Sequence, residues 1–136
     1  LRLGLGATPC EAHKTRDLLA VFESQDQVAA LAPNFAQLAQ VEALVVIATA
    51  PGDDCDFVSR CFAPRGGIDE DPVTGSAHCT LTPYWAQRLG KTTMQARQIS
   101  ARGGELSVEL RGDRVLIGGQ AQLYLRGSIR VSEEGE

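Results

Sequence analysis

The sequence predicts a single α+β domain, because strand-like segments lie on both sides of one amphipathic helical segment. The chain has 136 residues, the size of one ordinary domain that buries roughly two-thirds of its unfolded surface. Apolar residues make up 43% of it and charged residues 22%, both typical of soluble globular proteins. We therefore expect one domain over residues 1–136.

The charge distribution limits the classes of partner. The formal net charge is −4, and acidic and basic residues are interspersed rather than clustered. Such a surface lacks the basic patch that attracts nucleic acid or anionic lipid. No apolar run reaches the roughly 18 residues that a membrane helix needs. We expect a small-molecule or protein partner, with neither nucleic acid nor membrane bound.

Four cysteines and two histidines are the candidate soft metal ligands, but no C-x-x-C pair occurs among them. A structural zinc site is therefore not expected. No signal-peptide pattern precedes the first strand-like segment, so we expect reduced thiols in a cytoplasmic protein. The chain begins at Leu1 without Met, as a fragment, an unusual start or a processed chain would.

Alternation and β-branched content predict four strands in the first half of the chain, the last of them half-exposed. They cover residues 1–8, 17–23, 42–50 and 56–62. Two short helices are expected between the second and third strands. Ser24 with Gln27 forms a capping pair for the first helix, which Pro33 ends, and Asn34 caps the second.

A loop, one helix and a run of strands are predicted in the second half. Residues 63–75 hold three glycines and two prolines, which excludes a helix or a central strand there. Residues 76–90 place an apolar residue at every fourth position and end at a glycine, as a helix does. The apolar stripe consists of Ala77, Leu81, Trp85 and Leu89, with Pro83 expected to kink the helix.

Strands are expected after this helix over residues 94–100, 105–111, 114–119 and 120–131. Gly112 and Asp113 lie between two alternating runs, which is a hairpin setting. The acidic tail, residues 132–136, is expected to fray.

The start of the long helix is the candidate site. Asp69, Glu70 and Asp71 precede a proline, and Thr74-Gly75-Ser76 leads into the helix. The free amides of Gly75 to Ala77 and the helix dipole favour a bound carboxylate or phosphate. A carboxylate side chain beside such an anion site could move a proton on an acid substrate. The alternative is a capped helix that follows an acidic surface loop.

His78 and Cys79 lie in the first turn of the same helix. The helix dipole there lowers the pKa of a thiol. Adjacent helical residues point about 100° apart, so only one of the two is expected to face the anion site. Cys79 is then either a reactive thiol or a side chain packed in the core.

The residues around this loop resemble the second-half signature of PhzF-like (phenazine-biosynthesis-type) proteins. The similarity is carried by residues 59–64, 67–68, 70–78, 83–86, 88–91, 98–104 and 118–121, in that order. It covers essentially the whole chain, and a match of this length is highly specific.

The resemblance implies a diaminopimelate-epimerase-like fold: two similar α+β halves, each a curved, mostly antiparallel sheet around a central helix, with the active site between them. This chain resembles the C-terminal half. In that family a glutamate and a histidine of the first half act together with an Asp and a Ser of the second, which correspond to Asp71 and Ser76. The substrate would be held by Gly75, Ala77, Thr74 and His78, without a cofactor.

The implied function is half of an isomerase that moves a proton on a small unsaturated or amino-acid-like carboxylic acid. Nothing in the chain matches the first half, so a missing first half or a partner subunit is needed. The alternative is a non-catalytic or remnant module that binds a small anion or only itself. A half of such a fold leaves an apolar flank exposed, which predicts a homodimer with the loops 71–76 facing a shared cleft.

Overall fold

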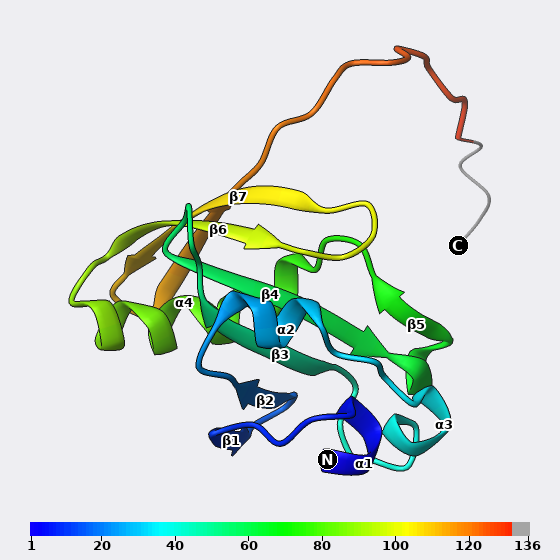
Figure 1. The fold of residues 1–136 in the computed structure, drawn as a ribbon. Helices are drawn as coiled ribbons and strands as arrows, with labels where there is room; N and C mark the ends of the chain where they lie inside the picture. The colour runs from blue at the N-terminus through cyan, green and yellow to red at the C-terminus, as the bar shows by residue number, and fades with distance from the viewer. Residues whose placement is uncertain (132–136) are drawn as a thin grey trace.

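A computed structural model describes residues 1–131, in which one sheet curves around a long helix (Figure 1). The helices are α1 (Arg2–Leu5), α2 (Gln25–Ala29), α3 (Phe35–Leu38) and α4 (Gly75–Leu89), with a 3₁₀ turn at Pro64–Gly66. The strands are β1 (Glu11–Lys14), β2 (Leu18–Val21), β3 (Val46–Pro51), β4 (Phe57–Ala63), β5 (Ile68–Asp71), β6 (Thr93–Gln98), β7 (Gly104–Arg111) and β8 (Arg114–Gly118).

The sheet is mostly antiparallel and does not close on itself. Its strand order is β1-β2-β3-β4-β6-β7-β8, and only the β2/β3 and β4/β6 pairs are parallel. β5 pairs with the same side of β4 as β6 does, further along that strand. β5 and β6 therefore follow one another along one edge of β4, which sets the geometry of the candidate site.

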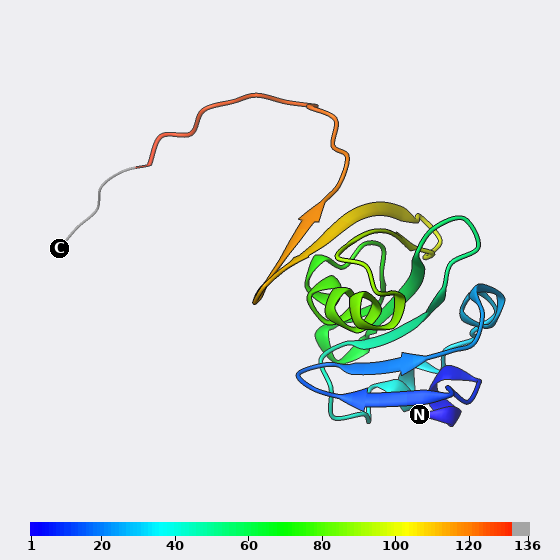
Figure 2. The same ribbon diagram turned by 90° about the vertical axis from the view of Figure 1, so that its left-hand side faces the viewer.

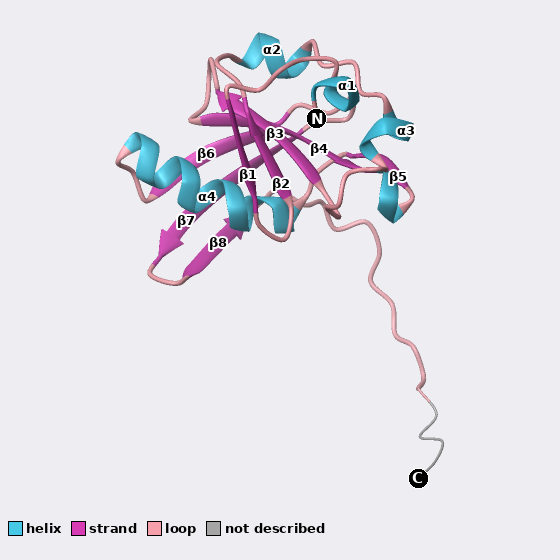
Figure 3. Ribbon diagram, turned by 90° about the horizontal axis from the view of Figure 1, so that it is seen from below, coloured by secondary structure: helices cyan, strands magenta, loops and turns pink. Residues whose placement is uncertain are grey.

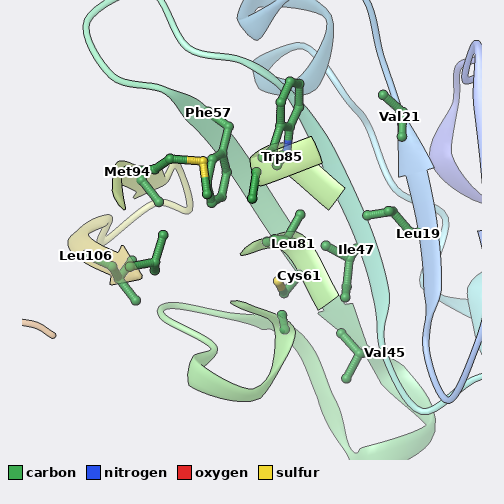
Figure 4. Close-up of a cluster of buried hydrophobic side chains, with 14 residues drawn as sticks. Leu19, Val21, Val45, Ile47, Phe57, Cys61, Leu81, Trp85, Met94 and Leu106 are labelled. Carbon is green, nitrogen blue, oxygen red and sulfur yellow. The ribbon is translucent and has the colours of Figure 1, made fainter. Parts of the chain in front are cut away.

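Two apolar clusters lie on the two faces of the sheet. α4 packs against the concave face, where Phe57 and Cys61 of β4 point toward it (Figure 4). The short helices α1, α2 and α3 lie on the other face, which takes Val58 and Phe62 (Figure 3). The prediction that residues 56–62 are half-exposed is wrong, because this strand is central and buries both of its faces.

Helix α4 forms the predicted central helix, enclosed by the curved sheet in Figure 2. Ala77, Leu81 and Trp85 are at most 1% exposed. The stripe ends there, since Leu89 is 38% exposed where the last turn extends past the sheet. Pro83 lies inside an uninterrupted helix, and Gly90 ends it in the left-handed conformation. The helix thus survives its proline because its apolar face is buried.

The predicted helix caps are confirmed. Ser24 Oγ accepts a hydrogen bond from the Gln27 amide at 3.3 Å, and Asn34 Oδ1 accepts one from the Gln37 amide at 3.1 Å. The hairpin is also confirmed, because Arg111 pairs with Arg114 across Gly112, whose φ is +58°. These local signals involve residues within three or four positions of each other.

Two predicted strands are wrong. Residues 1–8 contain helix α1 instead, because Leu1 and Leu5 pack on one side at helical spacing and Gly4 lies against Leu38. The predicted strand over residues 120–131 instead extends away from the sheet and pairs with no strand among the described residues. The tail from residue 132 lies outside the described residues. Strands β1 and β5 are present although they were not predicted.

Candidate functional site

The candidate site lies where β5 ends beside the end of β6. Cys61 of β4 pairs with Asp71, and Ser59, two residues earlier, pairs with Gln98. Neighbouring pairing positions on one strand edge bring Asp71 and Gln98 together although 27 residues separate them. The chain then crosses from Asp71 to the start of α4.

The buried side chain of Gln98 fixes this crossing. Its Nε2 donates to the main-chain oxygen of Asp71 at 2.6 Å and to Thr74 Oγ1 at 3.1 Å. Its Oε1 accepts from the amide of Thr74 at 2.8 Å. Ser100 adds a further tie, because its hydroxyl donates to the carbonyl of Pro72 at 2.8 Å. The loop between β5 and α4 is therefore held from the β6 side.

Thr74 links the loop to the carboxylate. Its hydroxyl donates to Asp71 Oδ2 at 2.6 Å and does not cap the helix that it precedes. Its amide is already bound to Gln98, and the residue is 8% exposed. The expectation that Thr74 binds substrate directly is therefore not supported by this geometry. Thr74 orients Asp71 instead.

The first amides of α4 remain open. Gly75 and Ser76 are exposed, and no side chain among the described residues accepts a hydrogen bond from the amides of Gly75, Ser76 or Ala77. A Cβ added at Gly75 would meet no atom within 4 Å. The amides of the exposed Gly75 and Ser76 are thus free beside Asp71, whereas Ala77 is 0% exposed, so two of the three predicted donors are accessible.

The three adjacent carboxylates have different surroundings. Glu70 accepts two hydrogen bonds of 2.8 Å from Arg60, whose guanidinium also donates to the carbonyl of Leu31 after helix α2 at 2.9 Å. Asp69 is exposed. Glu70 is thus committed to a structural ion pair, which leaves Asp71 as the carboxylate beside the helix start.

His78 lies in the first turn of α4, as predicted, but its side chain is buried. Its ring is fully buried against Phe57, and Nδ1 donates to the carbonyl of Thr74 at 2.8 Å. Burial lowers the pKa of His78, and the hydrogen bond to Thr74 opposes this only in part. The imidazole supports the first turn from inside, so direct substrate contact by His78 is not supported. Cys79 is exposed, which excludes its packing in the core.

Gln98 and Ser100 were missed by the residue-level prediction of the site. Along β6 the buried positions are Met94, Ala96 and Gln98. The polar Gln98 therefore occupies a position where the alternation would place an apolar side chain. A buried polar residue needs hydrogen-bond partners. This break in the alternation could have indicated that Gln98 has a structural role. It could not have indicated that its hydrogen-bond partners are Asp71 and Thr74.

Comparison with known proteins agrees with the family resemblance and with the fold. The family model described as "Phenazine biosynthesis-like protein" matches residues 3–127. An uncharacterized isomerase of Pseudomonas aeruginosa is 53% identical over 133 residues, which are 97% of this chain and 51% of that protein. The human phenazine biosynthesis-like domain-containing protein is 57% identical over 75 residues, 54% of this chain and 26% of that protein.

Solved structures show the same similarity. A PhzF-family protein of Enterococcus faecalis has a TM-score of 0.88 at 46% identity, covering 91% of this chain and 48% of that one. A putative PhzC/PhzF protein of Clostridium difficile has a TM-score of 0.84 at 44% identity, covering 93% and 49%. The chain belongs to the PhzC-PhzF, phenazine biosynthesis-like family, and its fold is of the diaminopimelate-epimerase type.

The chain spans about half the length of the curated relatives that it matches most fully. No helix among the described residues is both long and apolar enough to cross a membrane.

Proposed function

We propose that this chain forms one wall of a cofactor-free isomerase site for a small carboxylic acid. The observation that carries the proposal is the pairing of open amides at Gly75 and Ser76 with the Asp71 carboxylate, which Thr74 orients. The amides bind the acid group of the substrate, and Asp71 with Ser76 positions and relays the proton. The family resemblance supports the same roles for Asp71 and Ser76.

The second wall comes from outside the described residues. Glu70 is tied to Arg60 and cannot take the part of the glutamate that the resemblance assigns to the other half. A wall open to water also does not desolvate a substrate, which weakens electrostatic catalysis. We propose that a polypeptide equivalent to the unmatched half of the relatives completes the site.

Carboxylate binding is tested with crotonate, a small unsaturated acid, and crotonamide, its uncharged analogue. Crotonate should shift the amide NMR signals of Gly75, Ser76 and Ala77, and crotonamide should not. Gly75→Pro removes the amide donor of residue 75. Proline is tolerated at this first position of the helix, because Thr74 before it is extended. Gly75→Ala keeps that donor at comparable bulk, so affinity should fall further in Gly75→Pro. Equal shifts with both ligands would contradict an anion site.

Proton transfer is tested in D₂O with this chain and the complementary half of the Pseudomonas aeruginosa relative. A panel of small unsaturated and amino acids is monitored for deuterium uptake by mass spectrometry. Asp71→Asn should abolish uptake, and Asp69→Asn, an exposed neighbour, should retain it. Uptake that is unchanged in Asp71→Asn would refute the assigned role.

A second candidate is a non-catalytic module that binds a small anion. The commitment of Glu70 to Arg60 favours it, because no other glutamate adjoins Asp71 in the sequence. Crotonate binding without deuterium uptake into any acid by the assembled halves would support this second candidate.

A further inference from the structure

Strand β5 carries a β-bulge directly before Asp71. Between its two pairing positions with β4, β5 has two residues, Asp69 and Glu70, whereas β4 has one, Phe62. The two pairs are Cys61 with Asp71 and Ala63 with Ile68. A bulge of this kind bends the strand and changes the direction of the side chains beyond it. It therefore decides which side chain of β5 faces the candidate site.

The bulge turns Asp71 toward helix α4. Asp71 lies opposite Cys61, whose side chain belongs to the cluster around α4, and directly opposite residues share one face of the sheet. Glu70 belongs to the other face, because its carboxylate meets Arg60, which reaches the carbonyl of Leu31 after helix α2. The two neighbouring carboxylates thus point to opposite faces, one toward the site and one away from it.

A regular pairing would exchange these two carboxylates. If β5 continued without a bulge from the pair of Ala63 with Ile68, the residue opposite Cys61 would be residue 70 instead of residue 71. Because side chains alternate at a period of two, Glu70 would then face α4 and Asp71 would point away. The sequence places a carboxylate at the site in either register, so a contact outside the site must select between them.

The ion pair between Arg60 and Glu70 fixes the bulged register. Nε and Nη2 of Arg60 donate to the two oxygens of Glu70 at 2.8 Å each, and the side chains are 13% and 19% exposed. Nη1 donates to three main-chain oxygens at and after the end of α2, at 2.9 to 3.3 Å. The guanidinium also lies 5.1 Å from the ring centroid of Phe62, the single residue opposite the bulge. A Glu70 turned toward α4 would lose both of its bonds and leave a largely buried arginine without its anion.

We propose that Arg60 is a positioning residue that acts through Glu70 to hold the bulge and thereby selects Asp71 as the carboxylate that faces the site. The acidic triplet then has one task for each member. Asp69 is the exposed residue of the bulge, Glu70 is its anchor, and Asp71 serves the site. The inference rests on the role of Asp71 proposed above, but the register itself is measured without a substrate.

The register is measured by NMR, from the nuclear Overhauser contacts of the backbone protons of Cys61. In the wild-type chain these contacts should reach Asp71 across the two strands. In Glu70→Ala, which leaves the bonds of Arg60 to the end of α2 in place, they should move to residue 70. Asp69→Ala changes the exposed neighbour in the same bulge and should leave them at Asp71. Arg60→Met breaks the ion pair from its other side and should act as Glu70→Ala does.

Deuterium uptake is measured on the same variants, together with the complementary half of the Pseudomonas aeruginosa relative. Glu70→Ala should lower the rate at saturating substrate at least about 10-fold, because an acid–base group acts only within hydrogen-bond reach. Asp69→Ala should change the rate by less than about 3-fold. Deletion of Asp69 from the Glu70→Ala variant removes the extra residue, so regular pairing again places Asp71 opposite Cys61. This deletion should restore the register and bring the rate to within about 3-fold of wild type, which it would not do if Glu70 only stabilised the fold.

Contacts of Cys61 that stay at Asp71 in both Glu70→Ala and Arg60→Met would overturn the proposal. So would a shifted register with an unchanged rate, or a register that the deletion restores without restoring the rate. Uptake that survives Asp71→Asn in the wild-type background would instead refute the proposed function, and the NMR contacts would still decide whether Arg60 holds the bulge.

Discussion

Trp85 donates its indole N–H to the hydroxyl oxygen of Thr49 at 3.0 Å, and Thr49 in turn donates to the carbonyl of Val58 at 2.7 Å. The indole also stacks on Phe57 with ring centroids 5.7 Å apart. This contact joins the centre of α4 to two central strands. It satisfies a polar group that would otherwise be buried without a partner.

Trp85→Ala should therefore lower the free energy of unfolding by about 3 to 5 kcal/mol. The loss combines a large cavity with removal of the hydrogen bond that Thr49 Oγ1 accepts from the indole, while the bond from Thr49 to Val58 remains. Leu89→Ala, on the same helix but 38% exposed, is the control and should cost less than about 1 kcal/mol. Urea unfolding measures both, and a Trp85→Ala loss no larger than that of Leu89→Ala would mean that the apolar stripe does not hold α4.

Gln98→Ala should lower the free energy of unfolding by about 1 to 3 kcal/mol, because it leaves the Thr74 amide and the Asp71 carbonyl without their partner. It should also weaken crotonate binding, since the loop before α4 loses its tie. Gln95→Ala, an exposed position on the same strand, should change neither quantity. Normal crotonate affinity in a folded Gln98→Ala variant would show that the loop is held without it.

His78 should make stability depend on pH in a defined direction. Burial lowers its pKa below the usual 6.5, so the unfolded chain binds this proton more tightly than the folded chain does. The free energy of unfolding should be full above pH 6.5 and decline as the pH falls below that value. One proton contributes at most about 1.4 kcal/mol per pH unit.

Urea unfolding at pH 7.5 and 5.5 checks this expectation, in a range above the usual pKa values of carboxylates. His78→Gln should remove most of the difference between the two pH values. His13→Gln changes an exposed histidine and should leave the difference in place. Stability that rises on acidification would contradict the neutral, buried imidazole.

The local parts of the fold were predictable from the sequence, and the long-range parts were not. The caps at Ser24 and Asn34 and the turn at Gly112 depend on neighbouring residues. Residues 1–8 were misassigned because Leu1, Leu3 and Leu5 fit a two-residue period, although Leu1 and Leu5 are also four residues apart, as on one face of a helix. The burial of Phe57 and Cys61 together with Val58 and Phe62 depends on helices that cover both faces of β4.

The candidate site was likewise predictable only in its local parts. Asp71 and the Gly75-Ser76 helix start were found from local chemistry, and the structure brings them together. The inward direction of His78 and the role of Gln98 depend on the packing of α4 and on strand register. Strand register of this kind cannot be read directly from a single sequence.

The sharing of one edge of β4 by β5 and β6 has a consequence for the order of folding. The loop before α4 is fixed by Gln98, which is synthesised only after the whole of that helix. A nascent chain ending before β6 holds Asp71 and the helix start without their anchor, so closure of this 27-residue segment must precede assembly of the site. Binding competence is therefore expected to arise late in folding, together with the pairing of β6 to β4.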